Sequence, residues 1–327
     1  MRSTVVGPYP RVGSEYGKGL RKELNRFYKG EGDEGLIRQL RENLTKEVVQ
    51  EMTSVGIDLP NYGLIDIHDE LTWPLESVEG VDFGGMKKTF HTNIHYREAV
   101  VNGLIERTKR IVSPLYDVVV GEYTNTKIEI PGPYTMAKHS VLGDGAPYKN
   151  IAELAMAYAT LLKEELLDLK DVPMVQFNEP SIIAHGKDHS DIGIVPELYQ
   201  EMLHGVEIPT AVWTFYGIYV PNSLKVVFSL PVDLVGLDFV WDPNVADLLQ
   251  VLSHDKGIGI GIIDSGDRGY IGLENKDDTI RKLNKLKERV NFDKSYISNN
   301  ATLEHLPRDV ARQKVALIGE ITREVNE

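Results

Sequence analysis

The feature that most constrains the fold of this chain is an eightfold alternation of short apolar runs with longer amphipathic stretches. The short runs are rich in β-branched residues and lack the polar alternation of half-exposed antiparallel strands. They are typical of strands that lie buried in a parallel sheet. We predict eight such strands, at residues 4–7, 63–66, 127–131, 174–177, 210–214, 234–238, 259–263 and 295–298.

Helical periodicity follows each predicted strand. In residues 33–55 the apolar side chains of Leu36, Leu40 and Leu44 recur at helical spacing, which predicts a helix with one buried face. A further apolar run at residues 116–121 is predicted to form a hairpin or rim strand. The other predicted helices span residues 96–112, 151–169, 196–204, 222–229, 244–253, 278–290 and 309–325.

Eight strand–helix repeats favour an α/β fold that closes into a single (β/α)8 TIM barrel over residues 1–327. We expect an N-terminal extension after strand 1 and a small hairpin before strand 3, because the chain exceeds the ~250 residues of a typical barrel. An open doubly wound sheet is the alternative. No G-x-G-x-x-G motif follows a predicted strand, so a dinucleotide-binding fold has no local support.

The composition narrows the classes of partner. A formal net charge of −13 disfavours nucleic acid and anionic membranes, although a local cluster of Lys and Arg could still bind a small anion. The chain has no cysteine, which excludes disulfides, thiolate nucleophiles and Cys-ligated metals. We see no signal peptide and no apolar run near ~18 residues, so we expect a cytoplasmic protein without a membrane span.

Polar side chains gather where the predicted strands end. In a (β/α)8 barrel those ends form the face that carries the chemistry. An acidic residue there can also simply cap the following helix. Polar groups at all eight strand ends exceed what capping needs, which favours a ligand site. The residues are Arg11, Asp66, His68, Tyr134, Asn178, Glu179, Thr214, Tyr216, Asp238, Asp264, Arg268, Asn299 and Asn300.

Two histidine pairs have a spacing that can chelate a metal on a helix. They are His91 with His95 and His185 with His189, each four residues apart. The spacing specifies no third ligand, so a structural role is favoured for the first pair and a mobile loop for the second.

Several segments in a consistent order resemble the cobalamin-independent methionine synthase family. They are VVGPYPRVG, GLRKELNRFYKG, MKKTFHTNIHY, IPGPYTMAKHS, VQFNEPSI, TFYG, LPVDLVGLDFVWDP and NATLEHLPRDVA. In that family a C-terminal barrel holds zinc and homocysteine, and a related N-terminal barrel without zinc helps to bind the polyglutamate tail of methylfolate. MKKTFHTNIHY and LPVDLVGLDFVWDP resemble the N-terminal half. A stand-alone catalytic barrel is the alternative for a chain of this length.

The resemblance places the family's zinc ligands at identifiable positions. Zinc in the catalytic barrel activates the thiol of homocysteine. This chain has Trp213 and Phe215 at the His-x-Cys pair, Asp238 at the Glu, and Ala301 at the last Cys. Asn178 stands where the family has a homocysteine-binding Asp. We therefore expect no bound metal and no methionine synthase activity from this chain alone.

The resemblance also implies cations for the folate tail. Lys18, Arg21 and Lys88 stand at or near the family's basic positions, and charge-assisted hydrogen bonds would join them to the glutamate carboxylates. The alternative is that all three are ordinary solvated surface groups. Tyr216 and Trp213 belong to an aromatic patch that could stack on a pterin ring or fill the space of the zinc.

The predicted function is therefore that of a non-catalytic or accessory barrel. It would bind methyltetrahydrofolate polyglutamate and act with a separate zinc-bearing catalytic chain that methylates homocysteine. The alternative is a repurposed enzyme of the same superfamily, a methylcobamide-type methyltransferase or a decarboxylase-like barrel, in which Asp66 and Arg11 would face the substrate. A purely structural subunit is the third possibility. The predicted substrate-binding residues are Lys18, Arg21, Lys88, Asn178, Glu179, Trp213, Tyr216, Asp238 and Asp264.

Overall fold

The centre of the molecule is a curled parallel sheet. The computed structural model describes residues 1–90, 92, 94–183, 191–249, 252, 255–266, 269, 272–287 and 290–327. Its main sheet has seven strands in the order β1-β10-β9-β8-β7-β6-β4, and all neighbouring strands are parallel. The strands are β1 (Arg2–Ser3), β4 (Ile128–Pro131), β6 (Val175–Asn178), β7 (Thr210–Trp213), β8 (Leu234–Asp238), β9 (Gly257–Ile263) and β10 (Tyr296–Asn299).

Residues 59–61 link the two edge strands of this sheet. Thr4, next to β1, forms a parallel bridge with Leu59, and Asn61 forms one with Lys127, next to β4. The prediction of a strand at residues 63–66 is wrong, because these residues form a turn. Gly63 and Leu64 have φ angles of +79° and +48°, in the left-handed region that a strand does not use. The extended backbone lies a few residues earlier.

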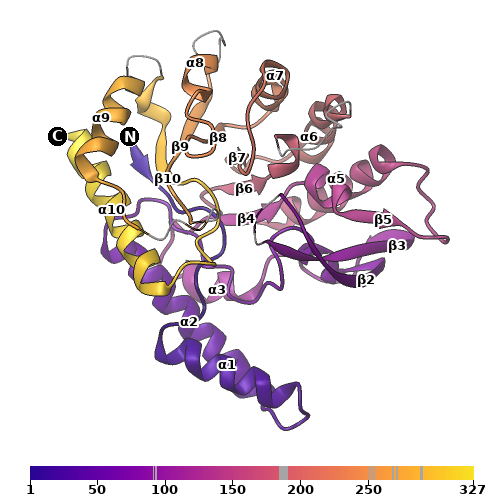
Figure 1. The fold of residues 1–327 in the computed structure, drawn as a ribbon. Coiled ribbons are helices and arrows are strands. Elements are labelled where there is room, and N and C mark those ends of the chain that lie inside the picture. Colours follow the sequence, from indigo (N-terminus) through magenta and orange to yellow (C-terminus); the bar gives the residue numbers. More distant parts are fainter. Residues whose placement is uncertain are drawn as a thin grey trace.

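Helices cover the outer face of the sheet (Figure 1). Most of the predicted helices are confirmed within a few residues, although residues 250, 251, 253, 288 and 289 of two predictions lie outside the described part of the chain. Pro133–Lys138 forms the additional short helix α4. The confirmed helices are α2 (Glu34–Ser54), α5 (Ile151–Asp168), α6 (Val195–Leu203), α7 (Pro221–Ser229), α8 (Val245–Leu249), α9 (Lys276–Lys287) and α10 (Arg308–Asn326).

A β-ribbon lies beside the main sheet, where a helix is predicted. β2 (Val78–Lys88) and β3 (His95–Arg107) pair in antiparallel fashion, and the short β5 (Ser140–Leu142) adds to β3 in parallel. The helix predicted at 96–112 is therefore wrong. The predicted hairpin before the third strand exists, but these residues form it.

The run at 116–121 is also assigned wrongly. It lies in the helix α3 (Pro114–Val120). The hydroxyl of Ser113 accepts a hydrogen bond from the backbone N–H of Leu115 at the start of this helix, and Pro114 occupies its first turn. A Ser–Pro pair is a helix-start signal, which the apolar composition of the run concealed.

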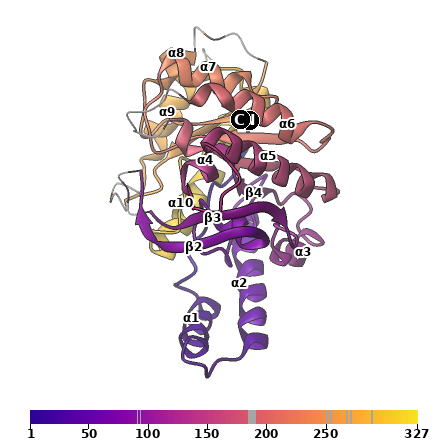
Figure 2. The ribbon, with the colours of Figure 1, turned by 90° about the vertical axis from the view of Figure 1, so that its right-hand side faces the viewer.

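A helical hairpin projects from the barrel wall (Figure 2). It consists of α1 (Glu15–Phe27) and the first half of α2, and it is the extension predicted after the first strand. Asp33 caps α2, because its carboxylate accepts hydrogen bonds from the N–H groups of Gly35 and Leu36. Leu20 of α1 is buried at 3 % exposure, whereas many charged residues of α1 face the solvent.

Candidate functional site

A buried ionic network crosses the interior of the sheet. Glu129 and Lys127 on consecutive inward positions near β4 are both fully buried, and they form an ion pair of 3.2 Å. The Glu129 carboxylate also accepts hydrogen bonds from the backbone N–H of Gly7 at 2.8 Å and from the side-chain amides of Asn61 at 2.8 Å and Asn178 at 3.2 Å. Predicted site residue Asn178 therefore belongs to the framework of the barrel interior.

Trp213 fills the space beside this network. Its side chain is 1 % exposed, and the ammonium group of Lys127 lies 5.3 Å from the centre of its ring system. Gly236 of β8 and Gly259 of β9 make room for the ring. A Cβ atom at these glycines would lie 1.9 Å and 2.2 Å from the indole, closer than any real contact. The indole therefore fits because both neighbouring strands have glycine where it lies.

The other positions matched to zinc ligands lie in the same apolar cluster. Phe215 is 1 % exposed and Ala301 is fully buried, and both pack in the cluster that contains Trp213. Asp238, also fully buried, accepts hydrogen bonds from the backbone N–H groups of Val240 at 3.0 Å and Trp241 at 2.9 Å. The Asp238 carboxylate is therefore occupied by hydrogen bonds to the backbone. Among the described residues, no group of three or more His, Asp or Glu is arranged to hold a metal ion.

Glu179 is a buried helix cap. Its carboxylate accepts hydrogen bonds from the N–H groups of Tyr134 at 3.1 Å and Thr135 at 2.8 Å, at the start of α4, and from the Thr135 hydroxyl at 2.6 Å. Burial raises the pKa of Glu179 to about 7, although these hydrogen bonds oppose the rise. Gly132 is required there, since a Cβ would lie 2.1 Å from Oε1 of Glu179.

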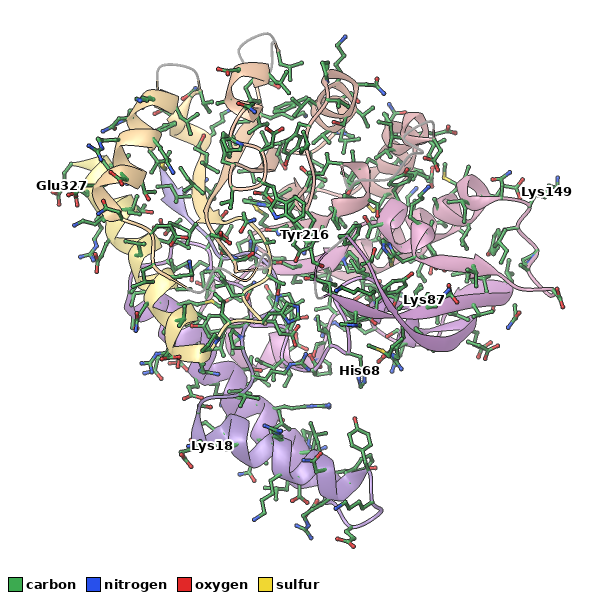
Figure 3. The ribbon with its side chains drawn as sticks, viewed as in Figure 1. Lys18, His68, Lys87, Lys149, Tyr216 and Glu327 are labelled. Carbon is green, nitrogen blue, oxygen red and sulfur yellow. The ribbon has the colours of Figure 1, made fainter. Side chains whose placement is uncertain are left out.

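Tyr216 lies at the centre of an aromatic and acidic cluster at the barrel mouth. Its backbone φ of +68° is in the left-handed region, which is strained for a tyrosine. The Tyr216 hydroxyl donates a hydrogen bond to Glu70 at 3.2 Å, and the ring of Phe90 lies 5.6 Å from its own. Figure 3 shows Tyr216 in the middle of the molecule, far from the tip of the projecting hairpin.

Glu70 is a site residue that the sequence patterns did not single out. Burial raises its pKa to about 8, and the neighbouring carboxylate of Glu304 adds to the rise. One of its oxygens, Oε2, is buried without a hydrogen-bond partner among the described residues. The only available signal was its place two residues after His68, in the acidic stretch that follows the second predicted strand.

Of the other predicted rim residues, some form hydrogen bonds within the fold and one lies at a different hollow. Asn300 donates a hydrogen bond to Asp238 at 3.1 Å. The side-chain amide of Asn299 accepts a hydrogen bond from the N–H of Val6 through its oxygen and donates one to the carbonyl of Val6 through its nitrogen. Asp264 forms a local turn with the N–H of Gly266 at 2.8 Å, and it lines a different hollow of about 450 Å³ with residues of α8 and α9.

The predicted cations of the folate tail lie on two elements. Lys18 and Arg21 are exposed on α1, and Lys88 is exposed at the end of β2. Lys18 forms a surface ion pair of 2.8 Å with Glu15. Figure 3 shows Lys18 on the projecting helix. The exposure of all three leaves them accessible to an anionic ligand.

Several sequence candidates lie outside the described residues. These are His91, His185, His189 and Arg268. His95 begins β3 and pairs in register with Lys88 on the neighbouring strand, so it lies on an antiparallel ribbon and not on the helix that its spacing from His91 suggested.

Comparison with known proteins identifies the family. Residues 80–290, more than half of the chain, match the model of the cobalamin-independent synthase N-terminal domain. The chain belongs to the cobalamin-independent methionine synthase family. Among curated relatives, the methionine synthase of Saccharolobus solfataricus is 25 % identical over 330 residues, which covers 99 % of this chain and 95 % of that protein. The methionine synthase of Sulfolobus acidocaldarius is 25 % identical over 320 residues, covering 96 % and 88 %.

Solved structures share the α/β fold with its curled parallel sheet. A B12-independent methionine synthase from Shewanella sp. W3-18-1, solved in complex with selenomethionine, superposes with a TM-score of 0.76 at 20 % identity over 98 % of this chain and 97 % of that one. A putative vitamin-B12 independent methionine synthase from Listeria monocytogenes gives 0.75 at 17 % identity over 99 % of both. Among the described residues of this family member, no helix is long and apolar enough to cross a membrane.

Proposed function

We propose that this chain is a zinc-free barrel of the methionine synthase family that binds methyltetrahydrofolate polyglutamate. It acts with a separate zinc-bearing chain, which transfers the methyl group to homocysteine in the cytoplasm. The observation that carries this proposal is the burial of Trp213, Phe215 and Ala301, at 1 %, 1 % and 0 % exposure, in one apolar cluster. These side chains stand at positions where the family's catalytic barrel has zinc ligands.

The residues at those positions do not fit a zinc ion. Indole, phenyl and methyl groups offer no lone pair to a metal, and Asp238 already accepts hydrogen bonds from Val240, Trp241 and Asn300. Homocysteine needs a deprotonated sulfur to attack a methyl group, and zinc normally lowers the pKa of that thiol. The methyl transfer is therefore assigned to the partner chain.

A role in binding the folate tail is supported by the exposed cations. Lys18, Arg21 and Lys88 keep positive charge accessible on a chain of net charge −13. Each glutamate of a polyglutamate tail adds a carboxylate that such cations can bind with charge-assisted hydrogen bonds.

The proposed fold is the family's closed eight-stranded barrel. Residues 59–61 would serve as its second strand, because Leu59 bridges to Thr4 and Asn61 to Lys127 on opposite edges of the main sheet. The N–H of Lys127 donates to the carbonyl of Pro60 at 2.8 Å, which supports this assignment.

The test combines metal content and methyl transfer on one purified sample. Elemental analysis should find no stoichiometric zinc. Homocysteine and methyltetrahydrofolate triglutamate should give no methionine with this chain alone, and this chain should stimulate a zinc-bearing catalytic barrel. Stoichiometric zinc with activity from the chain alone would show that the assignment of ligand positions is wrong. Absence of zinc together with no effect on the partner would refute the accessory role.

A second candidate function, a repurposed barrel enzyme, is favoured by one observation. Glu70 is buried beside the strained Tyr216, and its pKa of about 8 suits a proton donor near neutral pH. Turnover of a methylated donor or a porphyrinogen by the chain alone, without metal and abolished in Glu70→Gln, would establish this function. An inactive wild-type chain in those assays would exclude these two substrates.

A further inference from the structure

A cleft of about 620 Å³ lies between the projecting hairpin and the barrel wall. α1 and α2 form one side, and the start of α3 with the loop after residues 59–61 forms the other (Figure 2). None of the cations at Lys18, Arg21 and Lys88 lines it. The side chains that matter for its chemistry are Phe27, Tyr28, Arg38, Arg41, Asp66 and His68.

Two arginines of α2 face this cleft without a partner. Arg38 and Arg41 are three residues apart, so they lie on the same side of the helix. Within the described part of the chain, neither guanidinium group forms a hydrogen bond or ion pair, and the Nε atom of Arg41 is buried and unsatisfied. Glu34 and Glu42 also line the cleft. A buried donor without an acceptor is costly, which favours a ligand that supplies one.

The positive potential extends to the base of the cleft. The pKa of His68 is lowered, first by burial and then by the positive charges of Arg97, Arg41 and Arg11. Three guanidinium groups therefore act on one imidazole. Arg97 is paired with Glu76 and Arg11 with Glu304, so Arg41 is the guanidinium group of these three that has no ion pair among the described residues. An anion in the cleft would be attracted by this field.

An aromatic surface and a carboxylate complete the cleft. Phe27 and Tyr28 at the end of α1 are 39 % and 72 % exposed, and their ring centres are 6.1 Å apart. Asp66 accepts a hydrogen bond from the Ser113 hydroxyl at 2.5 Å through Oδ2. Its other oxygen, Oδ1, is buried without a hydrogen-bond partner in the described chain. That oxygen can accept a hydrogen bond from a ligand N–H group.

We propose that this cleft binds a flat aromatic carboxylate that also carries an N–H donor. The carboxylate would lie on Arg38 and Arg41, the ring against Phe27 and Tyr28, and the N–H group on Asp66. This inference deepens the proposed function and rests on it, because a folate also carries such an aromatic ring, N–H group and carboxylate; it concerns the place on this chain where they bind.

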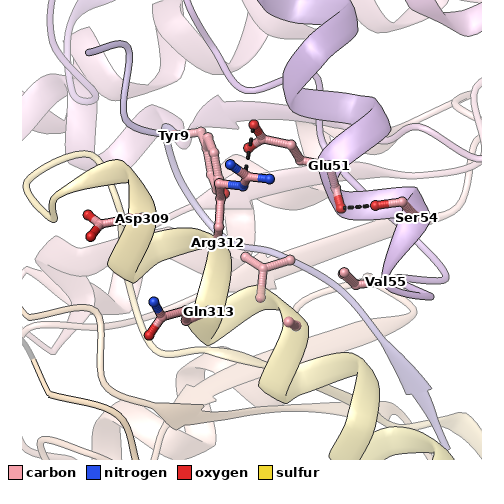
Figure 4. Close-up of a pocket in the computed structure, with 9 residues that line it drawn as sticks. Tyr9, Glu51, Ser54, Val55, Asp309, Arg312 and Gln313 are labelled. Carbon is pink, nitrogen blue, oxygen red and sulfur yellow. Dashed lines mark hydrogen bonds and ion pairs between the residues drawn. The ribbon is translucent and has the colours of Figure 1, made fainter. Parts of the chain in front are cut away.

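A second hollow, of about 340 Å³, lies between α2 and α10 and differs from the cleft because its arginine is paired with a carboxylate (Figure 4). There Glu51 pairs with Arg312 at 3.6 Å and with Arg308 at 3.0 Å. Both arginines there have a carboxylate counter-charge, although Arg308 Nε and Glu51 Oε2 are, like Arg41 Nε, buried without a hydrogen-bond partner among the described residues. The cleft at Arg38 and Arg41 lacks this internal pairing.

The test uses N-(4-aminobenzoyl)-glutamate as a probe in isothermal titration calorimetry. The wild-type chain should bind it, and Arg38→Ala with Arg41→Ala should weaken the affinity about tenfold or more, because charge-assisted hydrogen bonds are lost. The matched control is Lys22→Ala with Lys46→Ala, which removes the same charge from exposed positions of α1 and α2 outside the cleft. It should change the affinity less than about twofold, as screened surface charges do.

A second pair of measurements separates the ring from the charge. Tyr28→Ala, at a highly exposed position, should weaken the aromatic probe and leave the affinity for glutarate, which lacks a ring, unchanged. No binding of the aromatic probe to the wild-type chain, or equal losses in the arginine pair and the lysine pair, would overturn the inference. Stimulation of a catalytic partner would be untouched by that failure, so the two proposals fail separately.

Discussion

The barrel interior and the cleft of the helical hairpin treat their charged groups in opposite ways. Inside the barrel, Glu129 pairs with Lys127 and accepts hydrogen bonds from three other segments of the same chain. In the cleft, Arg38 and Arg41 face a hollow without such partners in the described residues. A network whose donors and acceptors pair with one another stabilises the fold, whereas a donor left unpaired can bind a ligand.

This difference bears on where a ligand can bind in this member of the methionine synthase family. The space beside β7, β8 and β9 contains Trp213, which Gly236 and Gly259 accommodate. Its closed packing excludes a ligand at that place. The projecting hairpin instead offers exposed cations and rings at the edge of the molecule. Variants of the interior and of the hairpin test this contrast.

The largest expected effect follows from removing Glu129. Glu129→Ala would remove the counter-charge of Lys127, which keeps its hydrogen bond to Gln176, and one acceptor each from the amides of Asn61 and Asn178. We expect the free energy of unfolding to fall by roughly 3–5 kcal/mol, as when one partner of a buried pair is lost. Urea denaturation measures this. The matched control is Glu47→Ala, at a partly exposed position of α2; a similar loss there would show that the interior is not special.

An effect of at most the same size is expected from emptying the space beside the network. Trp213→Ala should lower the free energy of unfolding by about 3–5 kcal/mol, toward the lower end if neighbouring rings relax inward. Gly236→Ala should destabilise the wild-type chain, because its new Cβ would overlap the indole. The same substitution should cost far less in the Trp213→Ala background. Additive effects in this double-mutant cycle would contradict the role assigned to the indole.

The pH dependence of stability should carry the signature of Glu70. Its pKa is raised from the ordinary 4.5 to about 8, so between these values the folded chain keeps a proton that the unfolded chain has lost. Stability from this group is complete below pH 4.5 and is lost as the pH rises through 8, at up to about 1.4 kcal/mol per pH unit. Glu179 contributes the same sign up to about pH 7.

Glu70→Gln sharpens this prediction. Urea midpoints at pH 7 and pH 8 should differ more in the wild-type chain than in the variant, since Glu70 stays mostly protonated at pH 7 whereas Glu179 is already half-titrated there. An unchanged difference in the variant would assign the titration to another group.

The smallest effect on stability is expected on the exposed helix. Lys18→Ala removes a surface ion pair with Glu15 and should leave the free energy of unfolding almost unchanged, because solvent screens exposed pairs. Its affinity for methyltetrahydrofolate triglutamate should nevertheless fall, and the loss should shrink at high salt. A measurable loss of stability with unchanged triglutamate affinity would reverse the contrast between the hairpin and the interior.

Local patterns predicted most of the main sheet and the helices around it. The apolar runs at 127–131, 174–177 and 234–238 contain β4, β6 and β8 within a residue or two. The run at 96–112 failed because apolar residues at Val100, Val101, Leu104 and Ile105 fit a helix as well as a strand. Pairing with β2, a contact between segments apart in sequence, decided in favour of the strand.

The candidate site was predicted less well than the fold. Residue types predict altered zinc positions, which stays a prediction, and they could not show whether Asp238, Asn178 and Glu179 face a ligand or the backbone. The structure places all three in hydrogen bonds within the chain. Glu70 went unnoticed because a single Glu in an acidic loop has no pattern; only its burial beside Tyr216 and Glu304 distinguishes it.

Most of the strands and helices, the family and the residue types at the positions matched to zinc ligands can be read from the order of residues, because each depends on local periodicity or on residue type. The filling of the barrel by Trp213, the capping role of Glu179 and the unpaired arginines of the cleft emerge only in three dimensions. Burial and pairing depend on which distant segments meet. A side chain's chemistry follows from those neighbours as much as from its own identity.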